Sequence, residues 1–168
     1  FKRMFHIILT MADSCLEFAH KKDAEKIVLI IELRETLLKL TEFNLRIINK
    51  TANQSVEQKS IAFFSTWNIG VLGKMWSYLA KEWSEQKKLQ KISLSNKEII
   101  FIDEVVQYTR DYYQLHYKTD AAILLKIRNK RYHLRKEGFA LLETSKNKSM
   151  IFNLLSIVEK IYDMSITY

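Results

Sequence analysis

Proline is absent from these 168 residues, and glycine occurs only three times. The tight turns of β-sheet proteins depend on both residue types, because proline fixes φ and glycine adopts positive φ without steric cost. A protein built from β-hairpins is therefore excluded. The chain is long enough to bury one substantial hydrophobic core. We expect one all-α domain over residues 1–168.

Cysteine is nearly absent too, because Cys15 is the only one. A single thiol cannot form a disulfide within the chain, and a reducing cytoplasm is the simplest location for such a protein. No zinc-ligand spacing, phosphate-binding loop or nucleophile elbow occurs. We therefore expect no metal and no cofactor.

Long apolar runs are limited to the segment Ser60–Ala80. It is long enough to span a bilayer but carries Lys74 near its centre, which costs about 2.5–3.5 kcal/mol on membrane insertion. We expect a buried bundle helix and no membrane partner. Gly70 and Gly73 then mark places where a neighbouring helix packs closely.

Helical periodicity extends over most of the chain and predicts five to six helices, at about residues 2–20, 24–50, 55–89, 95–117, 120–137 and 150–162. Capping boxes are predicted at Ser55–Gln58 and Ser95–Glu98. Thr119 or Asp120 can cap the fifth helix, and Gly138 is expected to end it in a left-handed conformation. The predicted fold is an all-α helical bundle.

The third helix carries an apolar stripe that we expect to face inward, composed of Ile61, Phe64, Asn68, Val71, Met75, Tyr78 and Leu79. Its aromatic residues, with Trp83, allow a second interpretation. Trp67, Trp76 and Trp83, together with Phe63 and Phe64, could stack nucleic-acid bases. Helical spacing favours core or dimer contacts for these five residues.

Negative charge is scarce relative to positive charge, which gives a net charge of +8 and a pI near 9.5. This balance favours polyanionic partners such as RNA, DNA or acidic membranes. The densest basic segment is KIRNKRYHLRKEG, with Lys126, Arg128, Lys130, Arg131, Arg135 and Lys136. On a helical wheel, Ala121, Leu124 and Leu125 form an apolar face. That face continues into polar residues, namely Arg128, Asn129, Tyr132 and His133.

RNKRYH, Arg128–His133, resembles the Arg-x4–6-His motif of the HEPN superfamily. Members are small helical domains, many of them ribonucleases of toxin–antitoxin, phage-defence and CRISPR systems. The resemblance implies a metal-independent endoribonuclease, in which the ribose 2′-hydroxyl attacks the phosphate and leaves a 2′,3′-cyclic phosphate. His133 would transfer the proton, Arg128 would bind the phosphate, and Asn129 would orient the reacting groups.

Four further cations, Lys126, Lys130, Arg131 and Arg135, would contact the RNA backbone. The resemblance also implies a homodimer, with both motifs facing one cleft, and allows a cognate antitoxin protein as partner. We expect the fifth helix at or beside the dimer interface, because its apolar face ends in polar groups that need partners. Some HEPN toxins carry a modifiable tyrosine two residues after the histidine, where this chain has Arg135. A standalone or abortive-infection effector is therefore expected.

Two alternatives stay open. Arg110 and His116 form a second match to the same motif. Glu17–His20 matches half of a di-iron site, but the sequence has no second copy, so we expect a surface or capping role for these residues. The alternative function is a non-catalytic dimeric helical binding module, either a nucleic-acid-binding regulator or an inactive HEPN partner. Convergence of the Arg128, Asn129 and His133 side chains in one cleft would separate these functions.

Overall fold

The computed structural model describes residues 1–51, 55–85, 92–118 and 120–166. Its six helices are α1 (Lys2–Lys21), α2 (Ala24–Lys50), α3 (Val56–Ser84), α4 (Asn96–Tyr117), α5 (Ala121–Thr144) and α6 (Lys148–Ser165). The described ranges contain no strand. The predicted all-α fold is confirmed. The predicted end of the third helix near residue 89 and the alternative cap Thr119 lie outside these ranges.

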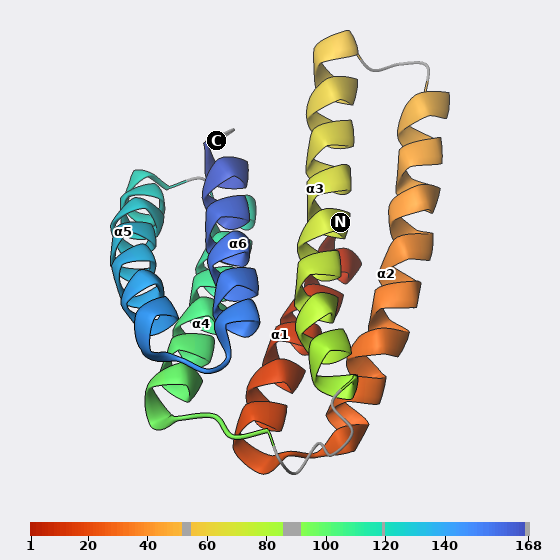
Figure 1. Cartoon of the computed structure of the whole chain (residues 1–168). Helices are drawn as coiled ribbons and strands as arrows, with labels where there is room; N and C mark the ends of the chain where they lie inside the picture. The colour runs from red at the N-terminus through yellow and green to blue at the C-terminus, as the bar shows by residue number, and fades with distance from the viewer. Residues whose placement is uncertain (52–54, 86–91, 119, 167–168) are drawn as a thin grey trace.

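The helices form two groups of three that pack side by side (Figure 1). In one group α1, α2 and α3 contact one another, and in the other α4, α5 and α6 do so. The groups meet where α1 packs on α4 and where α3 packs on α6. All six helices contribute to one hydrophobic core, while α2 and α5 lie on the outside.

Three of the predicted helix starts are confirmed by side-chain caps. Ser55 accepts a hydrogen bond from the Gln58 amide, and Ser95 accepts one from the Glu98 amide, each within a complete capping box. Asp120 accepts a hydrogen bond from the Ala122 amide at 2.8 Å. These caps depend on residues within one turn, so the sequence is sufficient to predict them.

The predicted helix end at Gly138 is wrong, because α5 continues through this residue to Thr144. Gly138 has no positive φ. A Cβ atom added there would lie 2.5 Å from Leu155 Cδ2 and 2.9 Å from Phe101 Cζ. The glycine therefore permits close packing of α5 on α6 and α4, and it does not cap the helix.

Close packing at Gly70 and Gly73 is confirmed. A Cβ atom at Gly70 would lie 2.8 Å from Thr41 Oγ1, and one at Gly73 would overlap Leu37 Cδ2. These two glycines bring α3 against α2. Trp76 and Trp83, further along α3, are fully buried in the core. None of the described helices has the length and apolar character needed to cross a bilayer.

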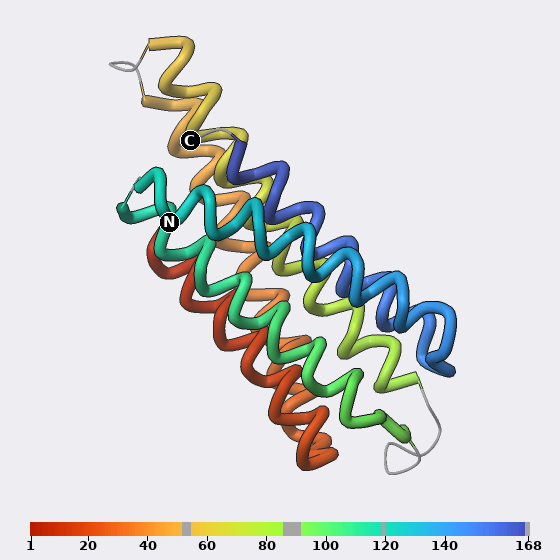
Figure 2. The backbone as a smooth tube through the Cα atoms, turned by 90° about the vertical axis from the view of Figure 1, so that its left-hand side faces the viewer, coloured from red at the N-terminus to blue at the C-terminus, as the bar shows by residue number. Residues whose placement is uncertain are grey.

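The α2–α3 hairpin is longer than the rest of the bundle. With 29 residues, α3 extends about 44 Å, whereas α6, with 18 residues, extends about 27 Å. The turn end of the hairpin consequently projects beyond the other four helices in both views (Figures 1 and 2). This part of α3 has fewer neighbours, and apolar side chains on it remain exposed.

Cys15 lies in the core on α1 and is fully buried. Its Sγ atom is 3.9 Å from the carbonyl oxygen of Trp76. Burial raises the pKa of the thiol far above its ordinary value. The free cysteine therefore acts as a small apolar core residue.

Candidate nucleic-acid interface

The basic residues of α5 do not lie where the helical wheel placed them. The buried positions of α5 are Ile127, Leu134 and Gly138. The predicted inward face is instead exposed to solvent, including Leu125, Arg128, Asn129, Tyr132 and His133. The predicted orientation of α5 is wrong, because α5 packs on both α4 and α6 and buries a different row of residues.

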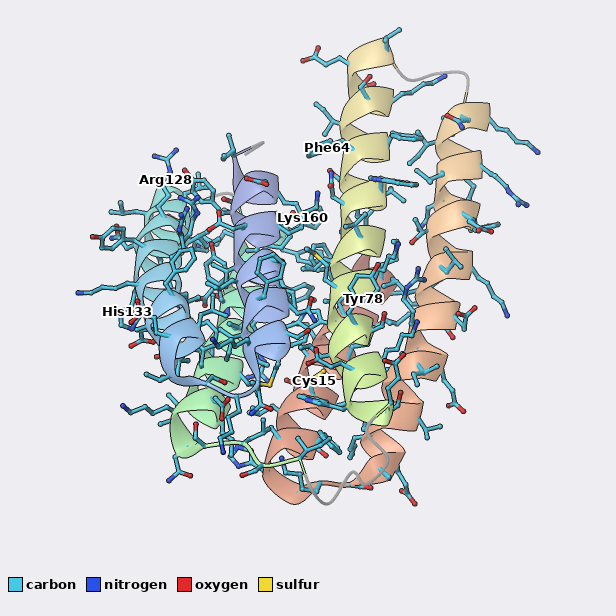
Figure 3. The ribbon with its side chains drawn as sticks, in the orientation of Figure 1. Cys15, Phe64, Tyr78, Arg128, His133 and Lys160 are labelled. Atoms are coloured by element: carbon cyan, nitrogen blue, oxygen red, sulfur yellow. The ribbon has the colours of Figure 1, made fainter. Side chains whose placement is uncertain are left out.

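The predicted catalytic residues are only partly brought together. Asn129 and His133 are one turn apart and share a face of α5. Arg128 precedes His133 by five residues, which corresponds to a rotation of about 140° around the helix. Figure 3 shows Arg128 and His133 leaving α5 at different heights and in different directions. Within one chain, the three side chains do not converge in one cleft.

Two of the predicted RNA-binding cations lie beside the buried carboxylate of Asp111 on α4. Lys126 donates a hydrogen bond to Asp111 Oδ1 at 2.7 Å, and Lys130 Nζ lies 3.5 Å from Oδ2. Asp111 has 9% of its side chain exposed, so this carboxylate depends on the two ammonium groups for its charge balance. Both lysines therefore serve the packing of α5 on α4.

The other two predicted cations lie beside Glu159 on α6. Arg131 donates from Nε and Nη2 to Glu159 Oε2 at 3.0 and 2.6 Å. Its guanidinium carbon lies 3.9 Å from the ring centroid of Tyr162. Arg135 Nη1 lies 3.3 Å from Glu159 Oε1. Ion pairing thus reduces the charge that these arginines present to a phosphate.

The second motif match is not assembled either. Arg110 donates a hydrogen bond to Asp13 on α1 at 2.5 Å. His116 packs against the rings of Phe1 and Phe5, with centroid separations of 5.5 and 4.9 Å. Burial, and then the positive amino terminus, lower the pKa of His116. These contacts connect α4 to α1 and are structural.

The possible half of a di-iron site has an ordinary surface role. Lys26 Nζ lies 2.7 Å from Glu17 Oε2, and this ion pair joins α1 to α2. This ion pair and the nearby positive charge of Lys21 lower the pKa of Glu17. His20 is exposed on the last turn of α1. These positions fit a helix end stabilised by charge.

The third helix provides a surface that the sequence analysis placed in the core. Ile61, Phe64 and Tyr78, which were predicted to face inward, are 58%, 43% and 43% exposed. The residues that α3 does bury are mainly Ile69, Leu72, Trp76, Leu79 and Trp83. Asn68 and Leu79 of the predicted stripe are buried, as predicted. The prediction was wrong for the three exposed residues because α3 is apolar on several sides, and periodicity alone then leaves its orientation undetermined.

Five residues form what we call the α3 stripe: Lys59, Phe63, Trp67, Lys74 and Tyr78. Their spacings of four, four, seven and four residues place them on one side of the helix. The stripe covers about 28 Å of helix. Trp67 is 54% exposed, and Lys74 Nζ lies 5.7 Å from the ring centroid of Tyr78. Figure 3 shows Tyr78 well below Phe64 on α3.

Two hollows follow the stripe along the crevice between α3 and α2. The first, of about 460 Å³, is lined by Ile48, Asn49, Lys59, Ser60, Phe63, Phe64 and Trp67. The second, of about 170 Å³, is lined by Arg34, Leu38, Thr41, Trp67, Gly70, Val71 and Lys74. Trp67 lines both hollows. Neither lining includes an acidic residue among those described.

The cations of this surface differ from those of α5 in their partners. Arg34, Lys59 and Lys74 form no ion pair with any described residue, whereas Lys126, Lys130, Arg131 and Arg135 each lie within 4.0 Å of a carboxylate. Unpaired cations that alternate with exposed aromatic rings are typical of surfaces that bind single-stranded nucleic acid. The spacing of Lys59, Phe63, Trp67, Lys74 and Tyr78 is visible in the sequence and could have indicated this surface.

Comparison with known proteins does not identify a family for this chain. No family model, curated protein or solved structure matches this chain. The HEPN resemblance accordingly rests on the residues of α5 alone and stays a prediction.

Proposed function

We propose that this protein is a helical module that binds single-stranded RNA along the α3 stripe. The observation that carries this proposal is that exposed aromatic rings and cations without an ion pair to a described residue lie together on one side of α3. It corresponds to the nucleic-acid-binding alternative derived from the sequence, with the contact surface moved from α5 to α3. The net charge of +8 supports association with a polyanion.

Each part of the surface would have a separate role in this complex. Phe63, Trp67 and Tyr78 offer flat faces on which unpaired bases can stack, at about 1–3 kcal/mol per base. Lys59 precedes Phe63 by one turn, and Lys74 lies between Trp67 and Tyr78 in sequence; both lysines would contact the phosphates. Stacking does not depend on base identity, so binding is expected to tolerate many sequences.

The direct test is titration of the protein with a fluorescently labelled single-stranded RNA of about 12 nucleotides. Anisotropy should rise, and affinity should fall with added salt. Tryptophan emission should also be quenched on binding, because Trp67 is exposed while Trp76 and Trp83 are buried. A duplex of the same sequence should bind less tightly, since its bases are not available for stacking.

Other occupants of the same surface give distinguishable results. If a second copy of the chain covers the stripe, light scattering will give a dimer mass that Trp67→Ala converts to a monomer mass. If an acidic membrane covers it, vesicles containing phosphatidylserine will bind and RNA will not. Either result would overturn the RNA proposal.

A second candidate function is the HEPN-type endoribonuclease predicted from α5. The observation in its favour is that Asn129 and His133 share an exposed face, next to an Arg128 that has no ion pair with a described residue. In a homodimer that joins two such faces, the Arg128 of one protomer could lie close to the Asn129 and His133 of the other. In this reading the protein is a cytoplasmic toxin or defence effector, with a possible antitoxin partner. RNA cleavage in EDTA, with a 2′,3′-cyclic phosphate product, is the test.

A further inference from the structure

Three potential ligand groups meet between α4 and α5, away from the α3 stripe. His133 and Glu137 are one turn apart on α5, and His133 Nε2 lies 3.2 Å from Glu137 Oε1. Glu104 approaches from α4, with its Oε1 atom 4.0 Å from the same nitrogen. One ligand atom from each residue can be chosen so that all three lie within 4.8 Å of one another.

We propose that Glu104, His133 and Glu137 form a zinc-binding site that joins α4 to α5. The site is independent of the proposed RNA-binding surface, because it uses different helices. It also differs from the expectation of no metal derived from the sequence. That expectation considered spacing along the chain, and Glu104 is 29 residues from His133 in sequence.

The donor set and its dimensions fit Zn²⁺. Zinc accepts imidazole nitrogen and carboxylate oxygen at about 2.0–2.2 Å, which places tetrahedral ligand atoms about 3.3–3.5 Å apart. The two distances from His133 Nε2, 3.2 and 4.0 Å, lie on either side of this range. Three protein ligands leave a fourth position for water, and the His133 side chain is 56% exposed toward solvent.

One oxygen of the Glu104 carboxylate, the buried Oε2 atom, lacks a hydrogen-bond partner among the described residues, and a bound cation would interact with it favourably. A buried acceptor without a partner is costly. The Glu137 carboxylate belongs to the same cluster, and two carboxylates held close together favour a cation between them.

The surrounding charges permit a bound dication. The positive charge of Lys130 on α5 acts on the Glu104 carboxylate. The Lys130 ammonium is directed to Asp111, 3.5 Å away, so its charge is partly balanced there. Bound zinc would replace the contact between two acidic side chains with a bridge between α4 and α5.

The test uses untagged, full-length protein that has been treated with EDTA and then dialysed. Zn²⁺ is titrated in competition with a chromophoric chelator, and Co²⁺ is titrated separately to record its visible absorption. We expect one Zn²⁺ per chain at micromolar concentration, a rise in Tm, and the intense absorption bands of four-coordinate Co²⁺. Mg²⁺ should not compete, because it prefers six oxygen ligands.

Variants distinguish this site from other histidines. His133→Ala and Glu137→Gln should each weaken binding by at least about tenfold. Glu104→Gln should do the same without unfolding the protein, because it removes a carboxylate that lacks a partner. His20→Ala, which removes an exposed histidine on α1, is the matched control and should leave binding unchanged. Absence of stoichiometric binding by the wild-type chain, or equal binding by wild type and His133→Ala, would overturn the proposal.

Discussion

Arg131 donates two hydrogen bonds to a single carboxylate oxygen of Glu159, from Nε at 3.0 Å and from Nη2 at 2.6 Å. The same guanidinium covers the ring of Tyr162. The residue that sequence analysis assigned to RNA is therefore a contact between α5 and α6. The guanidinium makes two hydrogen bonds and one cation–π contact within the chain, so few of its donors remain for a phosphate.

The first prediction follows from this contact. Arg131→Ala should lower the free energy of unfolding by about 1–2 kcal/mol, because it removes a charge-assisted hydrogen-bond pair and a cation–π contact. Urea denaturation measures the change. Lys136→Ala, an exposed cation on the same helix, is the control and should change stability by less than about 0.5 kcal/mol. Equal urea midpoints for the two variants would contradict the structural role.

The second prediction concerns Trp67. Trp67→Ala should reduce the affinity for single-stranded RNA roughly 5- to 150-fold, since one stacked base contributes about 1–3 kcal/mol. The exposed position means that stability should change little, which thermal denaturation will show. Tyr132→Ala removes an aromatic ring that is 76% exposed on α5 and serves as the matched control. If both variants bind RNA equally well, the α3 stripe is not the binding surface.

The third prediction separates unpaired from paired cations. Lys59→Ala and Lys74→Ala should each weaken RNA binding and reduce the slope of log K against log salt by about 0.7, the value for one contact to a single-stranded phosphate. Lys126→Ala should leave the slope unchanged, because Lys126 is bound to Asp111. The reverse pattern, with the slope altered only by Lys126→Ala, would restore α5 as the RNA-binding helix.

The fourth prediction is a pH dependence centred on Glu98, at the start of α4. Its carboxylate accepts hydrogen bonds from Ser95 N and Oγ, at 2.6 and 2.7 Å, and from Ser145 Oγ and Asn147 Nδ2, at 2.5 and 2.9 Å. Burial alone would raise the pKa of Glu98. The hydrogen bonds, led by that from Ser145, outweigh it and lower the pKa below the ordinary 4.5.

Because the folded pKa of Glu98 is lowered, its contribution to stability is complete above about pH 4.5 and is lost as the pH falls through the folded pKa. Glu98→Gln should therefore cost about 1.5–3 kcal/mol at pH 7, and this cost should shrink below pH 4. Denaturation curves of the variant and of wild type between pH 3 and pH 7 measure the difference. A cost that does not vary with pH would show that the ionised carboxylate has no special role.

The fifth prediction tests the second candidate function. If the chain cleaves RNA in EDTA, His133→Ala should reduce the rate about 10²–10⁴-fold while RNA affinity is retained. Arg128→Ala should lower both cleavage and affinity, since an arginine binds phosphate before and during the reaction. His20→Ala is the control. Cleavage that requires added Mg²⁺ would contradict the metal-free mechanism, and no cleavage of any RNA would leave α5 without an enzymatic role.

The starts of α3, α4 and α5 could be predicted because each depends on a hydrogen bond within one turn. Ser95 and Glu98 exchange their capping bonds whatever the rest of the fold does, and Asp120 caps α5 in the same way. The all-α class likewise follows from the missing turn residues. By contrast, the end of α5 could not be predicted, since Gly138 fits a cap by itself and only Leu155 and Phe101 show that the helix continues.

The buried faces of α3 and α5 could not be predicted from the sequence either. Each helix carries more than one apolar row, and which row is buried depends on neighbours that are remote in the chain. Ile127 and Leu134 are buried because α4 and α6 approach from their side. Partners such as Asp111 for Lys126, or Glu104 for His133, lie on other helices. A run of cations in a sequence does not reveal which of them are already neutralised.

The buried position of Cys15 has a practical consequence for measurement. The native surface has no competing thiol, because the only cysteine of the chain is fully buried and has a raised pKa. A cysteine introduced on α3, for instance Ser60→Cys, would react alone with a maleimide dye under native conditions. A pair of such positions, one on α3 and one on α5, would report how far the projecting hairpin moves from the outer helix during binding.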